Sequence, residues 1–415
     1  MPVELLAPAQ NFKSLKVVAG LVDAVYFGVE MLNMRMRADN FRTEELPQVA
    51  SFCHEHNMKA YLATNVILYN QELSEAAELI QKAHVAGIDA VIVHDMAAIG
   101  MCKDVGIPFH ISTQASISNI KAAQYYENLG AERFILAREL SLVQIAEIRK
   151  GLLRAKVECF VHGAQCTSIS GRCYFSADVC GTPENSANRG RCIQPCRRQW
   201  TLTDEEGNEF DYDGFHFLNA KDLCMIEYIP EMIAAGVDAF KIEGRMRRPD
   251  YIETVTRCYR EAIDSCSAGT FTTEKVDAWL VQLKQVYNRG FSTGFYFNRP
   301  TEKDIIHARG NVSSIFRQEI GIVIAYFRDS NVAEVLVTQG QLKVGDEICF
   351  EGVNTDTYFK QEVRSLHIKR LPITETPHIK GHDQKVAVGI QVDQPVKKND
   401  RVYKFTFREG NAPPA

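Results

Sequence analysis

The sequence predicts an α/β protein: a (β/α)8-type, TIM-like barrel with a cysteine-rich insertion, followed by a small antiparallel β-barrel. Short apolar runs alternate with amphipathic helical patterns over the first 300 residues, and glycine usually closes each helix before the next run. From about residue 318 the chain changes to short alternating runs typical of antiparallel strands. We therefore expect one domain at 1–300 and a second at 318–410.

Apolar runs in the first 250 residues are the candidate parallel strands, because strands buried on both faces are almost continuously apolar. They lie at 3–8, 23–28, 59–66, 89–95, 108–114, 133–137, 157–163, 215–219 and 238–244. A (β/α)8 barrel closes with eight strands, so one of these runs is expected to be an extra or edge strand. An open doubly wound sheet is the alternative, but it needs edge strands, and no run is polar enough to suggest one.

The remaining segments complete the predicted order of elements. An insertion at about 164–214 interrupts the barrel, and a helix is expected at 222–236. Amphipathic helices at 251–263 and 275–288 are expected to pack outside the barrel. The strands predicted for the second domain are 321–327, 332–338, 346–352, 358–368, 385–392 and 400–405.

Composition excludes several classes of protein. Hydrophobic residues make up 46% and charged residues 24% of the 415, which is typical of a globular chain. No run of eighteen apolar residues and no secretory signal is present, so we expect a cytoplasmic protein with no membrane partner. A net charge of −5 argues against a surface coated in positive charge for nonspecific nucleic-acid binding, although local basic patches remain open.

Cysteines concentrate in the predicted insertion. The twelve in the chain are too few for a disulfide scaffold, and clustered thiols in a reducing cytosol are more often ligands or catalysts. Four of them form the pattern Cys166-x6-Cys173 and Cys192-x3-Cys196. Glycines that permit turns surround them, at Gly163, Gly171, Gly181 and Gly190. This arrangement favours binding of a metal or cluster.

Spacing separates the kinds of thiolate site only in part. Zinc prefers pairs with two to four intervening residues, which only Cys192 and Cys196 satisfy. Iron–sulfur clusters accept wider spacing and commonly use four thiolates, so the pattern favours a cluster, with zinc or ordinary buried thiols as alternatives. Cys224, which follows the candidate strand at 215–219, is a substitute ligand or equally a buried thiol.

Several motifs give the chain a specific resemblance. ECFVHGAQCTSISGRCYFS at 158–176 resembles the signature of peptidase family U32, the collagenase-like peptidases, and further matching motifs are ELLAPA, DAVYFGV, STQAS, ARELSL, NRGRCIQPCR, NAKDLC and KIEGRMRRPDY. The resemblance covers essentially residues 1–300 and is nearest to the branch that hydroxylates tRNA uridine. It implies a [4Fe-4S] cluster on Cys166, Cys173, Cys192 and Cys196, 5-hydroxyuridine at the tRNA wobble position as product, and prephenate as co-substrate. Some relatives operate in pairs, so a homologous partner subunit is also expected.

Loops after the predicted strands carry the other candidate site residues, because barrel enzymes display catalytic groups there. Arg138 and Arg245 can each grip a carboxylate of a small organic acid, or else pair with Glu139 or Glu243. His162 precedes the cysteine-rich segment and can donate to a cluster sulfur or move a proton, or be a structural histidine. Our candidate catalytic residues are therefore His162, Arg138, Glu243 and Arg245.

Arginines crowd the cysteine segment in an otherwise acidic chain, at Arg189, Arg191, Arg197 and Arg198. Phosphate contacts from them would orient RNA, and Tyr174, Phe175 or Trp200 could stack an unpaired base. The alternative is that they neutralise a negatively charged cluster.

Two other functions remain open. A U32-type peptidase is hard to support, because the chain has no HExxH or GxSxG motif and no persuasive Cys–His pairing. A non-catalytic RNA-binding factor stapled by a metal is the third hypothesis.

Overall fold

The structure is a computed structural model that describes residues 3–210, 218–308, 310–380 and 384–408. It divides into two compact units, Met1–Val312 and Ser313–Ala415. Each unit has its own hydrophobic core. The site described below lies in the first unit.

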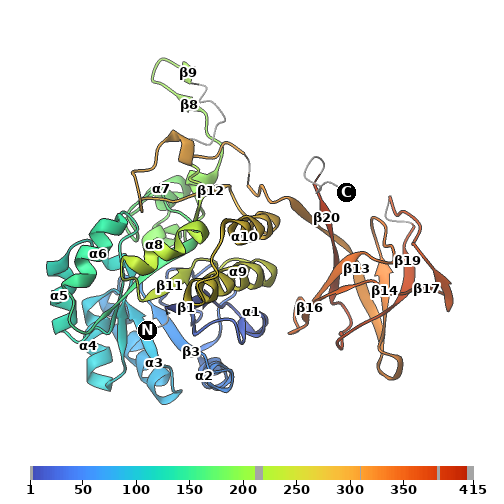
Figure 1. The fold of residues 1–415 in the computed structure, drawn as a ribbon, viewed down its shortest axis with the longest axis horizontal. Helices are drawn as coiled ribbons and strands as arrows, with labels where there is room; N and C mark the ends of the chain where they lie inside the picture. Colours follow the sequence, from blue (N-terminus) through green and yellow to red (C-terminus); the bar gives the residue numbers. More distant parts are fainter. Residues whose placement is uncertain (1–2, 211–217, 309, 381–383, 409–415) are drawn as a thin grey trace. The chain divides into compact units, whose positions relative to one another are not determined.

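Eight parallel strands close into a barrel in the first unit (Figure 1). β11 pairs with β1 on one side and with β7 on the other, which completes the ring. The strands are β1 (Glu4–Pro8), β2 (Ala24–Phe27), β3 (Lys59–Thr64), β4 (Ala90–Val93), β5 (Phe109–Ile111), β6 (Arg133–Ile135), β7 (Lys156–Ala164) and β11 (Ala239–Ile242). The predicted TIM-like barrel is confirmed.

A helix follows each barrel strand before the next one and covers the outside of the ring (Figure 1). These helices are α1 (Phe12–Val18), α2 (Leu46–Glu55), α3 (Leu73–Val85), α4 (Met96–Val105), α5 (Ile120–Asn128), α6 (Leu142–Lys150), α8 (Ile229–Ala234) and α9 (Pro249–Ser267). Local chemistry fixes their starts: the side chain of Asp95, for example, accepts a hydrogen bond from the backbone N–H of Ala97 at the first turn of α4. Within the described residues, no helix is both long and apolar enough to span a bilayer.

Eight of the nine predicted parallel strands form the barrel, and the run at 215–219 does not. Residues 215–217 of that run lie outside the described residues, and Leu218 and Asn219 are not part of a strand. The helix predicted at 222–236 is wrong in its first half. Asp222–Cys224 forms β10, which pairs antiparallel with the end of β7, and α8 begins only at Ile229. Pro230 explains the late start, because proline fits the first turn of a helix but not its interior.

The insertion and the segments after it are built from short elements. They include α7 (Phe175–Cys180), the hairpin of β8 (Leu202–Thr203) and β9 (Glu209–Phe210), and β12 (Phe291–Ser292), which pairs with β10. The two predicted amphipathic helices are α9 and α10 (Thr273–Gln285). α9 packs against α1 and β1, outside the barrel as expected.

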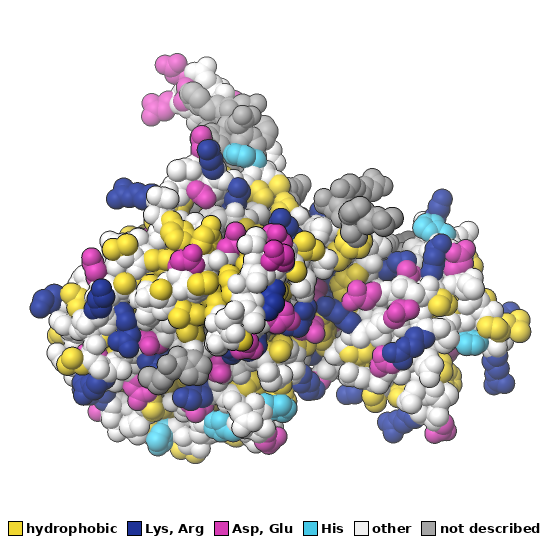
Figure 2. All heavy atoms as spheres, viewed as in Figure 1, with side chains coloured by type: hydrophobic (Ala, Val, Ile, Leu, Met, Phe, Trp, Pro, Cys, Tyr) yellow, Lys and Arg dark blue, Asp and Glu magenta, His cyan; other side chains and the backbone are white. Residues whose placement is uncertain are grey.

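The second unit is an all-antiparallel sheet of eight strands, as the alternating pattern predicts. Its order is β16-β15-β20-β13-β14-β19-β17-β18. The strands are β13 (Ile315–Phe327), β14 (Val332–Val337), β15 (Glu347–Glu351), β16 (Tyr358–Glu362), β17 (Leu366–Ile368), β18 (Leu371–Ile373), β19 (Val386–Gln391) and β20 (Arg401–Phe407). Figure 2 shows acidic and basic side chains interspersed over the visible face of both units.

Candidate functional site

A pocket opens inside the first unit at the carboxyl ends of the barrel strands, where barrel enzymes place their chemistry. The cavity has a volume of about 40 Å³, enough for a water molecule or one carboxylate-sized group. Its lining is Tyr26, Met34, Arg35, Ala63, Asn65, Ile92, Ser112, Thr113, Gln114, Ile135, Arg138, Phe160, Lys241, Glu243 and Arg245. Three of the four residues predicted as catalytic, Arg138, Glu243 and Arg245, thus come together in one pocket.

A single carboxylate organises the arginines of the pocket. Nη2 and Nε of Arg35 lie 3.0 and 3.2 Å from Oε1 of Glu243, and Nη2 of Arg138 lies 4.0 Å from Oε2. Arg245 approaches from the following loop and donates from Nη1 to Oδ1 of Asn33 at 3.2 Å. Asn33 also accepts from the backbone N–H of Arg35 and so fixes the segment that carries Arg35.

The electrostatics of the pocket favour an anion. Burial by itself would raise the pKa of Glu243, but the charges of Arg35, Arg138 and Arg245 outweigh it and bring that pKa to about 2. Burial lowers the pKa of Arg245 to about 10, and the neighbouring Arg35 acts in the same direction. Glu243 is therefore ionised at neutral pH, and three guanidinium groups surround its one charge. The excess positive charge in a buried pocket suits a negatively charged ligand.

Several polar atoms of the pocket have unused hydrogen-bonding capacity. Nε of Arg138, Nε of Arg245 and Oε1 of Gln114 are buried without a hydrogen-bond partner among the described residues. Arg138 is nevertheless held in place, because its Nη1 donates to the carbonyl of Ala164 at 3.0 Å and its guanidinium lies 4.1 Å from the centre of the Phe160 ring. Buried polar groups normally find partners, so the two Nε–H donors point to a ligand that supplies acceptors.

An ion-pair network supports the pocket from inside the barrel. Nζ of Lys241 lies 2.7 Å from Oε1 of Glu158, and Nη1 of Arg133 lies 3.0 Å from Oε2 of the same carboxylate. Arg133 also pairs with Glu4 at 2.7 Å. Breaking a buried pair of this kind costs several kcal/mol because a charge is left uncompensated. The network therefore fixes Lys241 in the pocket wall, where Glu158 neutralises its charge.

The cysteine-rich segment packs on the mouth of this pocket. Gly190, at φ +74°, accepts from the backbone N–H of Met36 at 3.1 Å, and a Cβ at this position would lie 2.2 Å from the carbonyl oxygen of Asn33. Gly171, at φ +71°, lies so close to the pocket residue Gln114 that a Cβ would be 2.6 Å from its Oε1. Only glycine adopts a positive φ readily and also leaves room for a neighbour this close. Gly171 and Gly190 therefore let the cysteine-rich segment pack against the pocket rim.

Cys192 and Cys196 respond electrostatically to the other predicted ligand thiols. Burial raises the pKa of Cys196, and the thiols of Cys166, Cys192 and Cys173 raise it further. Burial likewise raises the pKa of Cys192, with the same contribution from Cys166 and Cys173. All four are partly or fully accessible. Among the described residues, however, no group of three or more His, Cys, Asp or Glu side chains is arranged to hold a single metal ion.

Cys224 lies apart from this group. It is buried on β10, where Tyr259 donates to its sulfur at 3.9 Å, and burial raises its pKa to about 11. Cys180 ends α7 and is half-buried.

His162 lies at the end of β7 but does not line the pocket. Its ring packs among Tyr251, Tyr259 and Phe291, and Nδ1 lies 3.4 Å from the Tyr259 hydroxyl. Burial, with a smaller contribution from Arg247, lowers the pKa of His162 to about 3. The imidazole is therefore neutral and packed between the barrel wall and α9.

The four arginines predicted to bind RNA divide into two pairs. Arg197 donates to Asn219 and to the carbonyls of Ala220 and Gln165, and so ties the segment to β10. Arg189 pairs with Glu72 and donates to the carbonyl of Ile67. Arg191 and Arg198, in contrast, have exposed side chains. Exposed Tyr174 lies on the same segment, and the Phe175 and Trp200 rings pack together with centroids 5.5 Å apart.

Sequence reasoning missed two charged residues of the pocket. Arg35 lies in an irregular segment after β2, where no periodic pattern marks it, and Asn33, which accepts from its backbone N–H, lies two residues before it. Lys241 lies inside the apolar run that forms β11. A charged residue within a fully buried strand is the one signal that could have identified it.

An α/β barrel with an anion pocket beneath a thiol-bearing segment defines a barrel-type enzyme, and comparison with known proteins places it further. The model of the family described as "Peptidase family U32" matches residues 10–306. The chain therefore belongs to peptidase family U32.

Relatives extend over nearly the whole chain and carry different names. A Methanocaldococcus jannaschii protein named an uncharacterized protease is 39% identical, with 97% of this chain and 98% of the relative covered. A collagenase of Porphyromonas gingivalis is 36% identical, with 98% of each covered. The tRNA hydroxylation protein P1 of Bacillus subtilis is 33% identical, with 86% of this chain and 85% of the relative covered.

Proposed function

We propose that this protein is an RNA hydroxylase that forms 5-hydroxyuridine at the wobble position of tRNA in the cytoplasm, with prephenate as the small organic acid and a [4Fe-4S] cluster as cofactor. A relative that covers most of the chain is named for tRNA hydroxylation, which supports the RNA substrate. Each finer element of the proposal has a separate physical argument.

One observation carries the proposal: Arg35 belongs both to the anion pocket and to the surroundings of the thiols. Glu243 raises the pKa of Arg35 against the effect of burial, and Cys166 adds to that rise. The next residue, Met36, donates to the carbonyl of Gly190 in the cysteine-rich segment. A small anion in the pocket would therefore lie next to whatever the thiols hold.

The pocket supports an organic acid as ligand. Three arginines face one ionised carboxylate, and Nε atoms of Arg138 and Arg245 remain for acceptors. Guanidinium groups bind carboxylates through paired, charge-assisted hydrogen bonds. The cavity takes one carboxylate-sized group, so the rest of prephenate would extend toward the cysteine-rich segment. In this role Arg138 and Arg245 hold the acid, with Arg138 placed by Glu243 and Arg245 by Asn33.

The donor set fits an iron–sulfur cluster. Cys166, Cys173, Cys192 and Cys196 are four thiols of one segment, the other three of which raise the pKa of Cys196, and four thiolates are the usual ligands of a [4Fe-4S] cluster. When bound, such a cluster supplies one-electron transfer. Cys224 is not needed as a ligand, and we propose no catalytic role for His162.

RNA would approach over the cysteine-rich segment. Arg191 and Arg198 are exposed there and available for phosphate contacts, which orient RNA without reading its sequence. Exposed Tyr174 offers a face on which an unpaired base can stack. Arg189 and Arg197 instead hold the segment in place.

Nucleoside mass spectrometry tests the proposal directly. Deleting the gene should remove a hydroxylated uridine from cellular tRNA, and the wild-type gene should restore it. A gene encoding Arg245→Ala should restore no product although the protein accumulates. An unchanged nucleoside profile in the deletion strain would show that the proposed activity is wrong.

A peptidase is the second candidate, because relatives over the full length are named collagenase and protease. The described residues that line the pocket include Ser112 but neither a histidine nor a cysteine, so no activated nucleophile is found there. Cleavage of gelatin by the purified protein, abolished by Ser112→Ala, would favour this candidate. A non-catalytic, metal-stapled RNA-binding factor would instead bind tRNA while the deletion strain keeps its full set of modified nucleosides.

A further inference from the structure

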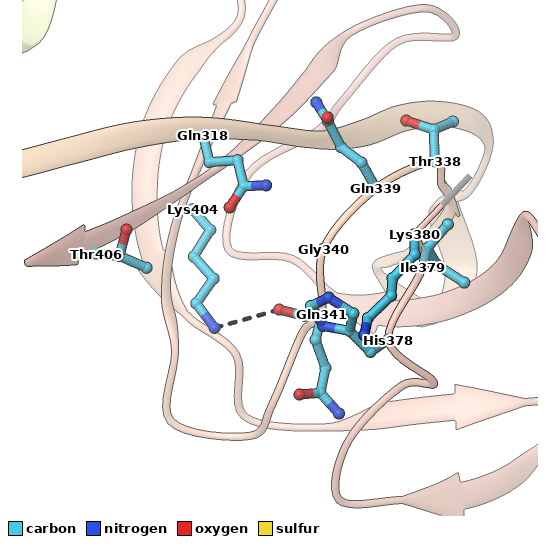
Figure 3. A pocket seen from close by; sticks show the side chains of 10 residues that line it. All are labelled: Gln318, Thr338, Gln339, Gly340, Gln341, His378, Ile379, Lys380, Lys404 and Thr406. Carbon is cyan, nitrogen blue, oxygen red and sulfur yellow. Dashed lines mark hydrogen bonds between the residues drawn. The ribbon is translucent and has the colours of Figure 1, made fainter. Parts of the chain in front are cut away.

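The second unit contains a polar pocket of its own, with a cavity volume of about 530 Å³, in the range of small-molecule sites. It lies where β13 and β20 meet the loop after β14 and the segment before β19. Ten residues line it: Gln318, Thr338, Gln339, Gly340, Gln341, His378, Ile379, Lys380, Lys404 and Thr406 (Figure 3). Most of these residues carry an amide, a hydroxyl or a basic group.

Basic side chains line this pocket, and Asp346 pairs with one of them, Lys404. The ten described residues that line it include two lysines and one histidine but no carboxylate. Nζ of Lys404 lies 3.2 Å from the carbonyl oxygen of Gln341 (Figure 3). It also lies 2.6 Å from Oδ2 of Asp346. His378 and Lys380 are exposed at the rim. A phosphate at the rim would contact Lys380, and no carboxylate among the described lining residues would repel it.

The amides of the pocket are positioned by the fold. Gln339 donates from Nε2 to the carbonyl of Glu319 at 2.6 Å, and Gln341 donates from Nε2 to the carbonyl of Thr376 at 2.8 Å. Their side-chain carbonyls are thereby oriented. Figure 3 shows the amide of Gln318 near Lys404 and on the side of Gly340. An amide carries a donor and an acceptor together, which is the pattern that reads the edge of a nucleobase.

We propose that this pocket binds one unpaired nucleotide of the RNA substrate, with Gln318 on the base edge and Lys380 on a phosphate. The proposal rests on the proposed function, because it assumes that RNA is the substrate. Single-stranded RNA is recognised through splayed bases whose edges are hydrogen-bonded, together with backbone phosphate contacts. The second unit would thus hold the RNA at a point separate from the nucleotide that reacts.

Fluorescence anisotropy of the full-length protein with a labelled, single-stranded ten-nucleotide RNA tests this pocket. Gln318→Leu should weaken binding about fivefold or more, without changing how affinity depends on salt, because it removes a neutral base contact. Lys380→Glu should also weaken binding, and should lower the slope of log affinity against log salt by about 1 because a phosphate contact is lost. Lys398→Glu, an identical charge change at an exposed lysine before β20, is the matched control and should stay within about twofold of wild type.

The result that would overturn the proposal is equally specific. If the wild type fails to bind the RNA, if both pocket variants bind as the wild type does, or if Lys398→Glu weakens binding as much as Lys380→Glu, the pocket is not a nucleotide site. Displacement of the RNA by polyglutamate as readily as by unlabelled RNA would also overturn it. Equal thermal unfolding midpoints exclude misfolding of the variants. Failure of the proposed function is seen separately, as an unchanged tRNA nucleoside profile in the deletion strain.

Discussion

Nη2 of Arg35 lies 3.0 Å from Oε1 of Glu243, and this contact joins a loop after the second barrel strand to the loop after the last one. At this contact the anion pocket lies next to the segment that carries the thiols. Because Glu243 is buried beside two further arginines, removing either partner changes both the stability of the protein and the charge of the pocket.

Glu243→Gln should make stability less sensitive to acid. The pKa of Glu243 is about 2 in the folded protein against 4.5 for the unperturbed group, so its stabilisation is complete above about pH 5 and is lost as pH falls toward 2. In urea unfolding, the wild type should lose about 2 kcal/mol more than the variant between pH 7 and pH 3. The same loss in both proteins would show that Glu243 is not held ionised by the arginines.

Arg138→Lys should raise the concentration of prephenate needed for half-maximal hydroxylation by about tenfold or more. A lysine keeps the charge but loses the planar fork that binds a carboxylate through two hydrogen bonds. The matched control is Glu139→Gln, at the adjacent exposed position, which should leave that concentration unchanged. Equal effects from the two substitutions, measured by tRNA nucleoside analysis with purified protein, would argue against an acid site at Arg138.

His162→Phe should remove a different component of acid sensitivity. Burial lowers the pKa of His162 from 6.5 to about 3, so the protein loses stability as pH falls below 6.5, where the unfolded chain binds the proton. Between pH 7.5 and pH 5 the wild type should lose about 2 kcal/mol of unfolding free energy that the variant retains. If the variant shows the same pH dependence, the imidazole is accessible and a role in proton transfer has to be reconsidered.

Serine substitutions should separate the cluster ligands from the other thiols. Cys166→Ser, Cys173→Ser, Cys192→Ser and Cys196→Ser should each reduce bound iron and sulfide in anaerobically purified protein, because each removes one thiolate. Cys180→Ser is the control within the same segment and should keep both. Cys224→Ser should also keep both, since its thiol is buried against Tyr259. Loss of iron in Cys224→Ser alone would assign the fourth ligand there instead.

The sequence predicts most of the barrel because its strands are buried on both faces and therefore appear as continuous apolar runs. β10 was not predicted, because its three residues, Asp222–Cys224, are too few to show an alternating pattern and directly precede a helical pattern. Their strand conformation comes from pairing with β7, which is a tertiary effect.

Part of the pocket was also predictable, because the barrel strands that precede its residues were predicted. Arg138 and Arg245 stand just after predicted strands, so the rule for barrel enzymes finds them. The sequence near a residue does not reveal which way its side chain points. Arg189 and Arg197 turn inward to backbone carbonyls, although they lie in the same arginine-rich stretch as the exposed Arg191 and Arg198. His162 likewise lies just before the cluster motif, and only the structure shows that its ring packs among aromatic side chains.

Iron and acid-labile sulfide analysis of the anaerobically purified wild-type protein tests the central claim most directly. If Cys166, Cys173, Cys192 and Cys196 hold a [4Fe-4S] cluster beside the Arg35–Glu243 pocket, the protein should be brown, absorb near ~400 nm, and contain about four iron and four sulfide per chain. A colourless protein, or one that contains zinc and no sulfide, would contradict the account.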